Sequence, residues 1–502
     1  MQASVKTVAF RGVDTLAVDV QIHIANGLPA MAIVGLADKS VAESKERVRA
    51  ALSSIGLALP AKRIAINLSP ADVVKEGGHF DLPIAVGLLI AMGIIPQDAI
   101  DGHVVLGELS LNGTIEPVTG VLSAALAAVA QQSGLICPHA SGPEAAWAGD
   151  LSILAPQDLV GLVNHIRGTQ LLTPPVAVFA SETKTHLDMA DLKGQETARR
   201  VLEIAAAGAH NLLLIGPPGA GKSMLAARLP GLLPPLTAEE ALQVTMLHSV
   251  AGQLLDGGLM RSRPFRDPHH SATMAALVGG GTRAKPGEIS LAHHGVLFLD
   301  ELAECSRHVL DALRQPLETG QIVIARANHN VCYPADFQFI AAMNPCRCGY
   351  LGDPARACAR APTCGRTYCA KISGPMMDRF DLIIEVPELA AQLLRDDRPA
   401  EATAPIAARI AAARNFATER DQQTANMPNA RLPAQQIDQM VRLDADGEAL
   451  LELAMQQRKL SARGLHKILR VARTIADLAR QKQVTRAHLA EALSYRTMPL
   501  LA

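Results

Sequence analysis

The chain has few aromatic residues and almost no net charge. Only 3% of its 502 residues are Phe, Trp or Tyr, and the formal net charge at pH 7 is -1. Binding of nucleic-acid bases by stacking on aromatic side chains is therefore not expected. The even charge balance also excludes a global basic field that would attract nucleic acid or an anionic membrane. Any contact with a polyanion has to be local.

Long apolar runs are also missing, and we expect no secretory leader. The longest apolar stretch, residues 82–95, contains Pro83 and is shorter than the roughly 20 residues that span a bilayer. The first residues lack a basic segment followed by an apolar core. We therefore expect a soluble, cytoplasmic protein with no membrane partner. Cysteine is scarce as well, because eight residues in 502 are too few for a secreted disulfide framework.

The chain divides into segments with different patterns, and 49% hydrophobic residues suffice for several cores. Residues 1–172 alternate strand-like and helix-like stretches, which is typical of an α+β domain. Residues 173–186 begin with adjacent prolines and predict a linker. A nucleotide-binding domain is expected over 187–390, and a helical lid over 391–502, where apolar residues recur at helical spacing. The whole predicts a multidomain α/β protein.

One octapeptide carries the strongest functional signal. It matches every fixed position of the phosphate-binding P-loop and comprises Gly216, Pro217, Pro218, Gly219, Ala220, Gly221, Lys222 and Ser223. An apolar strand is expected before it, over 212–215, and a helix after it, over 224–229. The glycines allow backbone N–H groups to surround the phosphates, Lys222 supplies a cation, and Ser223 is placed for Mg²⁺. ATP and Mg²⁺ are the expected cofactors.

A second motif, GVLFLDE over residues 295–301, reads as a strand that ends in two acids. In a P-loop enzyme Asp300 would hold the metal, and Glu301 would polarise the attacking water. The alternative is a buried strand followed by solvated acids. Because the two motifs occur together in the required order, hydrolysis is favoured over binding alone.

Several blocks resemble the magnesium-chelatase-like branch of the AAA+ ATPases. They are DLKGQETARRVLEIAAAGAHNLLLIGPPGAGKS (191–223), RPFRDPHHSAT (263–273), PGEISLAHHGVLFLDEL (286–302), YPADFQFIAAMNPC (333–346), SGPMMDRFDL (373–382) and LSARGLHKILRVARTIADL (460–478). The resemblance implies an α/β/α core with a parallel sheet. It also implies that Asn344 is sensor 1, Arg463 is sensor 2, and Arg379 is an arginine finger that acts on a neighbouring subunit of a homo-hexamer. The alternative for either arginine is a surface ion pair, for example with Asp378.

The layout of residues 1–172 resembles the domain of Lon-type proteases. In those enzymes a lysine activates a serine nucleophile. Here the serine position holds His79 and the lysine position holds Leu122. We therefore expect a non-proteolytic domain.

Five cysteines crowd into the loop 346–369. Four thiolates suit Zn²⁺, and a zinc would stabilise a long loop without an apolar core. The favoured ligands are Cys346, Cys348, Cys358 and Cys364, with Cys369 competing for the last position. The alternative is a set of scattered free thiols.

A hairpin is expected over 321–340, with a polar tip from Arg326 to Asn330. In the resembled family such an insert points at the central channel, so Arg326 and His329 are the candidate DNA contacts. Phosphate contacts of this kind do not depend on base sequence. The adjacent histidines 269–270 are assigned no role.

The leading hypothesis is a hexameric ATP-driven DNA motor, a branch-migration helicase that acts on single-stranded, forked or branched DNA. The resemblance implies that it promotes integration of incoming single strands by homologous recombination in natural transformation, with recombination proteins as further partners. The alternatives are the motor subunit of a magnesium chelatase and an ATP-gated remodelling scaffold.

Overall fold

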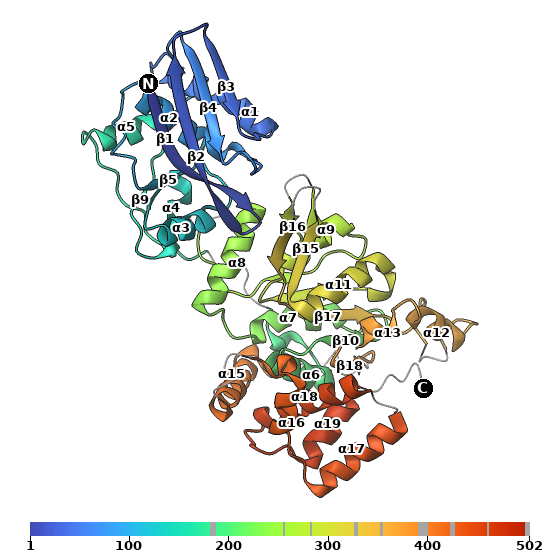
Figure 1. Cartoon of the computed structure of the whole chain (residues 1–502). Coiled ribbons are helices and arrows are strands. Elements are labelled where there is room, and N and C mark those ends of the chain that lie inside the picture. Colours follow the sequence, from blue (N-terminus) through green and yellow to red (C-terminus); the bar gives the residue numbers. More distant parts are fainter. Residues whose placement is uncertain are drawn as a thin grey trace.

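A computed structural model describes residues 1–180, 187–254, 257–281, 284–325, 330–351, 355–389, 400–421, 427–458 and 461–496. An N-terminal α/β part, a central part with a parallel sheet and a C-terminal group of helices follow one another in space as they do in the chain (Figure 1). None of the described helices is both long and apolar enough to cross a membrane.

The N-terminal part is built on a seven-stranded mixed sheet with the order β3-β4-β2-β1-β5-β8-β9. Its strands are β1 (Gln2–Arg11), β2 (Asp14–Ala25), β3 (Ala30–Val34), β4 (Arg63–Ser69), β5 (His103–Val105), β8 (Gly134–Ile136) and β9 (Ile153–Leu154). A small separate ladder joins β6 (Glu108–Leu109) and β7 (Ile115–Glu116). The helices are α1 (Lys39–Ser54), α2 (Asp81–Ala91), α3 (Val121–Ala130), α4 (Gly142–Ala145) and α5 (Leu159–Ile166).

Side-chain alternation along β2 explains how this sheet buries one face. Val18, Val20, Ile22 and Ile24 are buried, whereas the residues between them are exposed. Helix α2, whose residues are all buried, packs on β1 and β2. His79, just before α2, is buried and its Nε2 lies 2.9 Å from the carbonyl oxygen of Val8.

The central part contains a five-stranded sheet with the order β11-β14-β17-β10-β18, in which every neighbouring pair is parallel. The strands are β10 (Leu212–Ile215), β11 (Phe265–Arg266), β14 (Val296–Leu299), β17 (Gln338–Met343) and β18 (Leu382–Glu385). Continuous apolar runs such as LLLI and VLFL form the inner strands, because both faces of a parallel sheet are covered. The predicted parallel sheet is confirmed.

Helices and two hairpins surround this sheet. The helices are α6 (Glu196–Gly208), α7 (Lys222–Leu232), α8 (Ala238–Ala251), α9 (Met274–Val278), α10 (Glu288–Leu291), α11 (Arg307–Thr319), α12 (Thr363–Cys369) and α13 (Gly374–Met377). The hairpins are β12 (Gly279–Gly280) with β13 (Lys285–Pro286), and β15 (Gln321–Ala325) with β16 (Asn330–Pro334).

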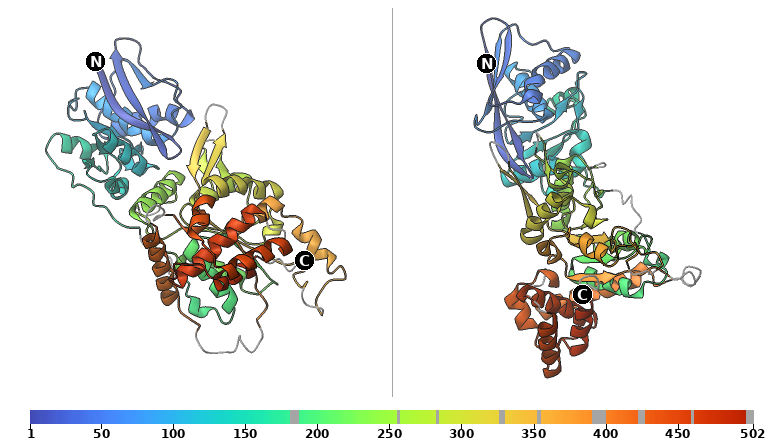
Figure 2. Two further views of the ribbon diagram at one scale, coloured as in Figure 1. Left: turned by 60° about the horizontal axis from the view of Figure 1, so that its bottom comes forward. Right: turned by 90° about the vertical axis from the view of Figure 1, so that its right-hand side faces the viewer.

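The C-terminal helices are α15 (Thr403–Arg420), α16 (Ala434–Met440), α17 (Ala445–Arg458), α18 (Ala462–Leu478) and α19 (Arg486–Ser494). Figure 2 shows them gathered against the central part. Their buried residues, such as Ile468 and Ile475 of α18, belong to the same hydrophobic cluster as Leu212 and Leu214 of β10. The C-terminal helices and the sheet therefore share one core.

The segment expected to be a linker is partly attached to its neighbours. Phe179 forms a β-bridge with Leu259, and its ring lies 4.7 Å from that of Trp147. The guanidinium of Arg261 lies 4.7 Å from the centre of the same ring. Residues 181–186 lie outside the described part of the chain.

A buried carboxylate also joins the N-terminal and central parts. Glu144 on α4 accepts hydrogen bonds from the hydroxyl of Ser249 on α8, at 2.5 Å, and from the backbone N–H of Leu122, at 2.9 Å. The same hydroxyl accepts the backbone N–H of Gly120 at 2.9 Å. Burial raises the pKa of Glu144, although these hydrogen bonds act in the opposite direction.

Candidate nucleotide-binding site and thiol cluster

The P-loop connects the carboxyl end of β10 to the first residue of α7. Gly219 and Gly221 have φ of +77° and +87°, in the left-handed region that favours glycine. An added Cβ at either glycine would meet no atom within 4 Å. The loop is therefore open, and the N-terminus of α7 gives it a partial positive charge. An anion such as a phosphate fits this arrangement.

Lys222 lies at the centre of the site and is 8% exposed. Its ammonium donates hydrogen bonds to the carbonyl oxygens of Gly216 and Pro217, at 2.7 and 2.9 Å. A third bond, at 3.1 Å, goes to the side-chain oxygen of Asn344, which follows β17. Burial lowers the pKa of Lys222, while nearby Asp300 and Glu301 act to raise it. The structure thus brings Lys222 and Asn344 together.

Ser223 and Asp300 form a second pair in the same site. The Ser223 hydroxyl donates a 2.6 Å hydrogen bond to Oδ2 of Asp300, which follows β14. Oδ1 of Asp300 accepts the backbone N–H of Glu301 at 2.8 Å. Hydroxyl and carboxylate oxygens are the ligands that Mg²⁺ prefers, so this pair could hold the ion beside the P-loop.

Glu301 has an unusual backbone and an unexpected partner. Its φ is +51°, which is uncommon for a residue with a side chain. Its Oε2 lies 3.0 Å from Nδ1 of His270, whose ring centre is 4.1 Å from that of His269, with the two rings tilted by 34°. From the sequence alone, no role is assigned to His270. The strand before it, Phe265–Arg266, is too short and too polar to give a local signal; His270 reaches Glu301 because β11 and β14 are parallel neighbours whose carboxyl ends lie at the same edge.

Arg379 lies at the opposite edge of the sheet from the P-loop. It precedes β18, whose first residue Leu382 pairs with Leu212 at the start of β10, whereas the P-loop follows the end of β10. Its guanidinium forms an ion pair with Glu318 on α11 and is 12% exposed. Asp378, the partner considered from the sequence, is not involved in this pair. Arg379 and the P-loop of the same chain therefore lie at opposite ends of neighbouring strands.

A buried ionic cluster anchors the segment that carries Arg379. Asp381 accepts the backbone N–H of Asn211 at 3.1 Å and lies 3.2 Å from the ammonium of Lys467 on α18. The side-chain amide of Asn211 donates to the Arg379 carbonyl at 3.0 Å. Burial alone would raise the pKa of Asp381, but Lys467 and His210 hold it well below its usual range. Sequence reasoning missed this cluster because its members are far apart in the chain.

Arg463 is exposed in the first turn of α18. Within the described residues, no hydrogen bond or ion pair joins it to the P-loop. Its expected role as sensor 2 therefore stays a prediction.

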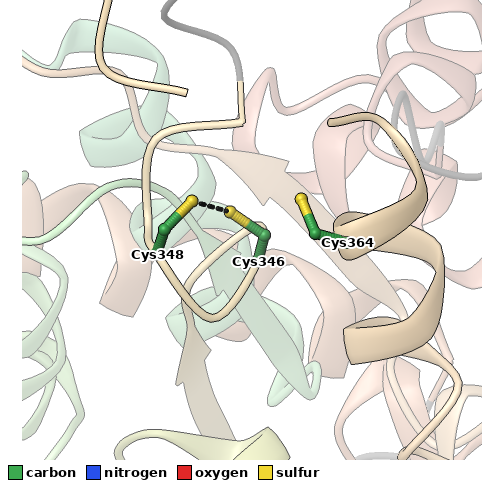
Figure 3. Close-up of side chains that lie close together, drawn as sticks. All are labelled: Cys346, Cys348 and Cys364. Carbon is green, nitrogen blue, oxygen red and sulfur yellow. Dashed lines mark hydrogen bonds between the residues drawn. The ribbon is translucent and has the colours of Figure 1, made fainter. Parts of the chain in front are cut away.

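Three of the predicted zinc ligands lie together (Figure 3). The sulfur atoms of Cys346, Cys348 and Cys364 are all within 4.8 Å of one another, and those of Cys346 and Cys348 are 3.0 Å apart. Cys358, the fourth predicted ligand, is not one of these three residues, but its side chain forms hydrogen bonds with those of Cys348 and Cys364. Cys369, the last residue of α12, is buried and is not in the group. Hydrogen bonding by Cys346 and by backbone N–H groups lowers the pKa of Cys348 to about 6. A thiophilic cation fits this donor set.

The hairpin expected over 321–340 is present as β15 and β16. Asn330, expected in the tip, is the first residue of β16 instead. Arg326 and His329 lie outside the described residues, so their contact with DNA stays a prediction. The end of the hairpin nearest its tip, where Ala325 pairs with Asn330, meets the N-terminal part: the guanidinium of Arg11 donates to the Asn330 carbonyl at 3.1 Å.

Comparison with known families gives three matches in succession along the chain. The family described as "Subunit ChlI of Mg-chelatase" matches residues 20–141, "Magnesium chelatase, subunit ChlI" matches 188–394, and "Magnesium chelatase, subunit ChlI C-terminal" matches 400–496. The second match contains the P-loop, the acidic motif and the thiol cluster.

Two similar proteins align over almost their whole length. Competence protein ComM of Haemophilus influenzae is 44% identical, and the alignment covers 98% of this chain and 96% of the length of ComM. YifB of Escherichia coli is 42% identical, and the alignment covers 99% of this chain and 97% of the length of YifB. The match to the magnesium-chelatase 38 kDa subunit of Rhodobacter capsulatus is shorter: it is 26% identical and covers 33% of this chain and 52% of the length of that subunit.

The chain belongs to the magnesium-chelatase-like AAA+ family, in the group that contains ComM and YifB.

Proposed function

We propose that this protein is an ATP-hydrolysing motor that works as a homo-hexameric ring on DNA. The observation that carries the proposal is the division of the site between two edges of one sheet. Lys222, Ser223, Asp300, Glu301 and Asn344 lie at the carboxyl edge, and Arg379 lies at the other.

Each residue at the carboxyl edge has a role in this proposal. The P-loop residues Gly216 to Ser223 hold the phosphates of ATP, and Lys222 exchanges its carbonyl partners for phosphate oxygens. Ser223 and Asp300 hold Mg²⁺, which when bound neutralises phosphate charge. Glu301 accepts a proton from the attacking water, and Asn344 orients that water.

The position of Arg379 supports assembly into a ring. An arginine finger stabilises charge on the transferring phosphoryl group. Arg379 lies at the edge of the sheet opposite the P-loop of the same chain, so in this proposal it serves the nucleotide of a neighbour. Its guanidinium is held by Glu318, and its backbone carbonyl accepts a hydrogen bond from the side-chain amide of Asn211. Arg463 of the C-terminal helices completes the site as sensor 2.

DNA is proposed as the partner because of the full-length similarity to a protein named for competence. In this proposal the motor moves branch points and helps to integrate incoming single strands by homologous recombination during natural transformation. With a net charge of -1, contacts to phosphates must come from local groups such as Arg326 and His329 on the hairpin. Zn²⁺ held by Cys346, Cys348, Cys358 and Cys364 is proposed as a further cofactor.

A motor subunit of a magnesium chelatase is the second candidate, since the matched families carry that description. Against it, the chelatase subunit from R. capsulatus aligns with only a third of this chain.

ATP turnover by the purified protein, with and without forked or three-stranded DNA, tests the proposal. We expect DNA to stimulate turnover and the protein to displace a strand, and the Glu301→Gln variant to do neither. A turnover that ignores DNA but responds to a porphyrin would reject the DNA motor in favour of the chelatase.

A further inference from the structure

The thiol cluster adjoins the nucleotide site through the chain itself. Only Pro345 separates Asn344, which binds Lys222, from Cys346, which is fully buried. The residues after Cys346 turn sharply, because the backbone N–H of Gly349 donates to the Cys346 carbonyl at 3.0 Å. Sensor, thiols and turn are therefore one continuous unit.

This turn rests directly on the P-loop. A Cβ added at Gly349 would lie 2.4 Å from Cδ and 2.8 Å from Cγ of Pro218, which is closer than real contacts allow. The φ of Gly349 is +85°, in the region that favours glycine. The backbone of the turn thus touches the second proline of the phosphate-binding loop with no side chain between them.

The opposite side of the turn is closed by α12. Cys364 is the second residue of this helix and reaches Cys346 and Cys348 from a separate stretch of chain. Its neighbour Gly365 is equally tight, since an added Cβ would lie 2.5 Å from Cδ2 of Leu351. A cation bound by the three sulfurs would tie α12 to the turn that presses on Pro218.

We propose that a thiophilic metal ion in the cluster of Cys346, Cys348 and Cys364 controls the affinity of the P-loop for nucleotide. The inference rests on the proposed function, because the controlled ligand is ATP. With the metal bound, the 346–349 turn is held against Pro218, and Asn344 keeps its place beside Lys222. Without the metal the turn loses its tie to α12, and the nucleotide binds more weakly.

Thermodynamic linkage relates the affinity for the metal to the affinity for the nucleotide. If the metal strengthens nucleotide binding by some factor, the nucleotide must strengthen metal binding by the same factor. Couplings of this kind are commonly about 5- to 150-fold. We expect at least about fivefold here, since the two sites share one backbone contact.

The test uses the full-length protein, stripped with a chelator and then titrated with Co²⁺, whose thiolate charge-transfer absorption reports occupancy. The affinity for a fluorescent, non-hydrolysable ATP analogue is measured by anisotropy with and without Co²⁺. The affinity for Co²⁺ is measured with and without the analogue. We expect both affinities to rise by the same factor.

Three variants separate metal binding by the thiols from the effect of the metal on nucleotide binding. Cys364→Ser should lose the absorption and bind nucleotide as weakly as the stripped protein, while Cys332→Ser, which removes an exposed thiol on β16, should behave as the parent. Gly349→Ala should keep the absorption yet bind nucleotide weakly with or without Co²⁺. Circular dichroism checks that each variant folds, and the stripped parent replaces Cys364→Ser if that variant unfolds.

Absence of Co²⁺ absorption in the parent would overturn the inference. So would Co²⁺ binding that leaves nucleotide affinity unchanged, although the ATPase proposal would then survive. Failure of the parent to bind nucleotide under any condition would instead reject the proposed function itself.

Discussion

The imidazole of His270 lies 3.0 Å from the carboxylate of Glu301, across the carboxyl ends of two neighbouring strands. The acid proposed to activate water is therefore paired with a histidine from the segment that follows β11. Both side chains are partly exposed, at 34% and 47%, so the pair is weak enough to break when nucleotide binds.

His270→Ala should raise ATP turnover in the absence of DNA. An exposed pair of this kind is worth about 0.2–1 kcal/mol, so release of Glu301 should raise kcat by up to about fivefold. Nucleotide affinity should not change, because His270 does not contact the P-loop motif. His269→Ala is the matched control, since its ring bonds Ser271 and not Glu301. A fall in kcat for His270→Ala alone would show that the histidine positions Glu301 productively.

Glu301→Gln should keep nucleotide binding and lose turnover. Removal of a general base costs about 10²- to 10⁴-fold. Lys222→Ala should lose binding itself, because three hydrogen bonds in the site depend on its ammonium. Equilibrium binding of a fluorescent nucleotide and steady-state turnover distinguish the two variants. Equal nucleotide affinity of Lys222→Ala and the parent would contradict the proposed site.

Arg379→Ala should bind nucleotide normally and lose turnover by about 10³-fold or more, as expected for an arginine finger. Mixing it with Glu301→Gln should restore part of the activity, because some interfaces then combine an intact acid with an intact arginine. Glu318→Gln is the control, since it frees the same guanidinium without removing it. If mixing restores nothing, the arginine does not act between chains.

Asp381→Asn should destabilise the contact between the C-terminal helices and the sheet by about 3 kcal/mol, because the buried ammonium of Lys467 loses its only carboxylate partner among the described ion pairs and keeps only backbone carbonyl acceptors. The pKa of Asp381 is lower in the folded state than its ordinary value. Its stabilising effect is therefore present above the unfolded pKa, near pH 4, and is lost as the pH falls below it. Urea unfolding at pH 7 and pH 3 measures both effects, with the exposed Asp378→Asn as the control. Equal stability of Asp381→Asn and Asp378→Asn at pH 7 would contradict the expectation.

Glu144→Gln should change how stability depends on pH. Burial raises the pKa of Glu144, so the folded state takes up a proton that the unfolded state lacks, and stability falls as the pH rises from about 4 through the raised pKa. Glutamine keeps an oxygen for Ser249 and Leu122 but carries no charge. The variant should therefore have the higher melting temperature at pH 8, and the difference should shrink at pH 4. Glu43→Gln, at an exposed site on α1, should show no such trend.

Much of the chemistry could be predicted from local sequence. The strand before the P-loop, 212–215, was predicted with its observed bounds, because a short apolar run next to a glycine-rich loop has few other ways to bury itself. The hairpin strand from Gln321 to Ala325 follows from the polar tip after it, which marks where a hairpin turns back. Close cysteines such as Cys346 and Cys348 must lie together wherever their loop goes. Signals of this kind depend on contacts between neighbours in the chain.

The long-range contacts of the site could not be predicted, because they depend on which strands and helices lie next to each other in the fold. His270 meets Glu301 because β11 pairs with β14, and Asp381 meets Lys467 because α18 packs beside the start of β18. The order of strands also places Arg379 at the edge away from the P-loop. These contacts join residues that are 31 to 86 positions apart, and burial of shared apolar surface, rather than any local pattern, selects them. The sequence by itself determined the groups that do chemistry, and only the tertiary structure decided which of them touch.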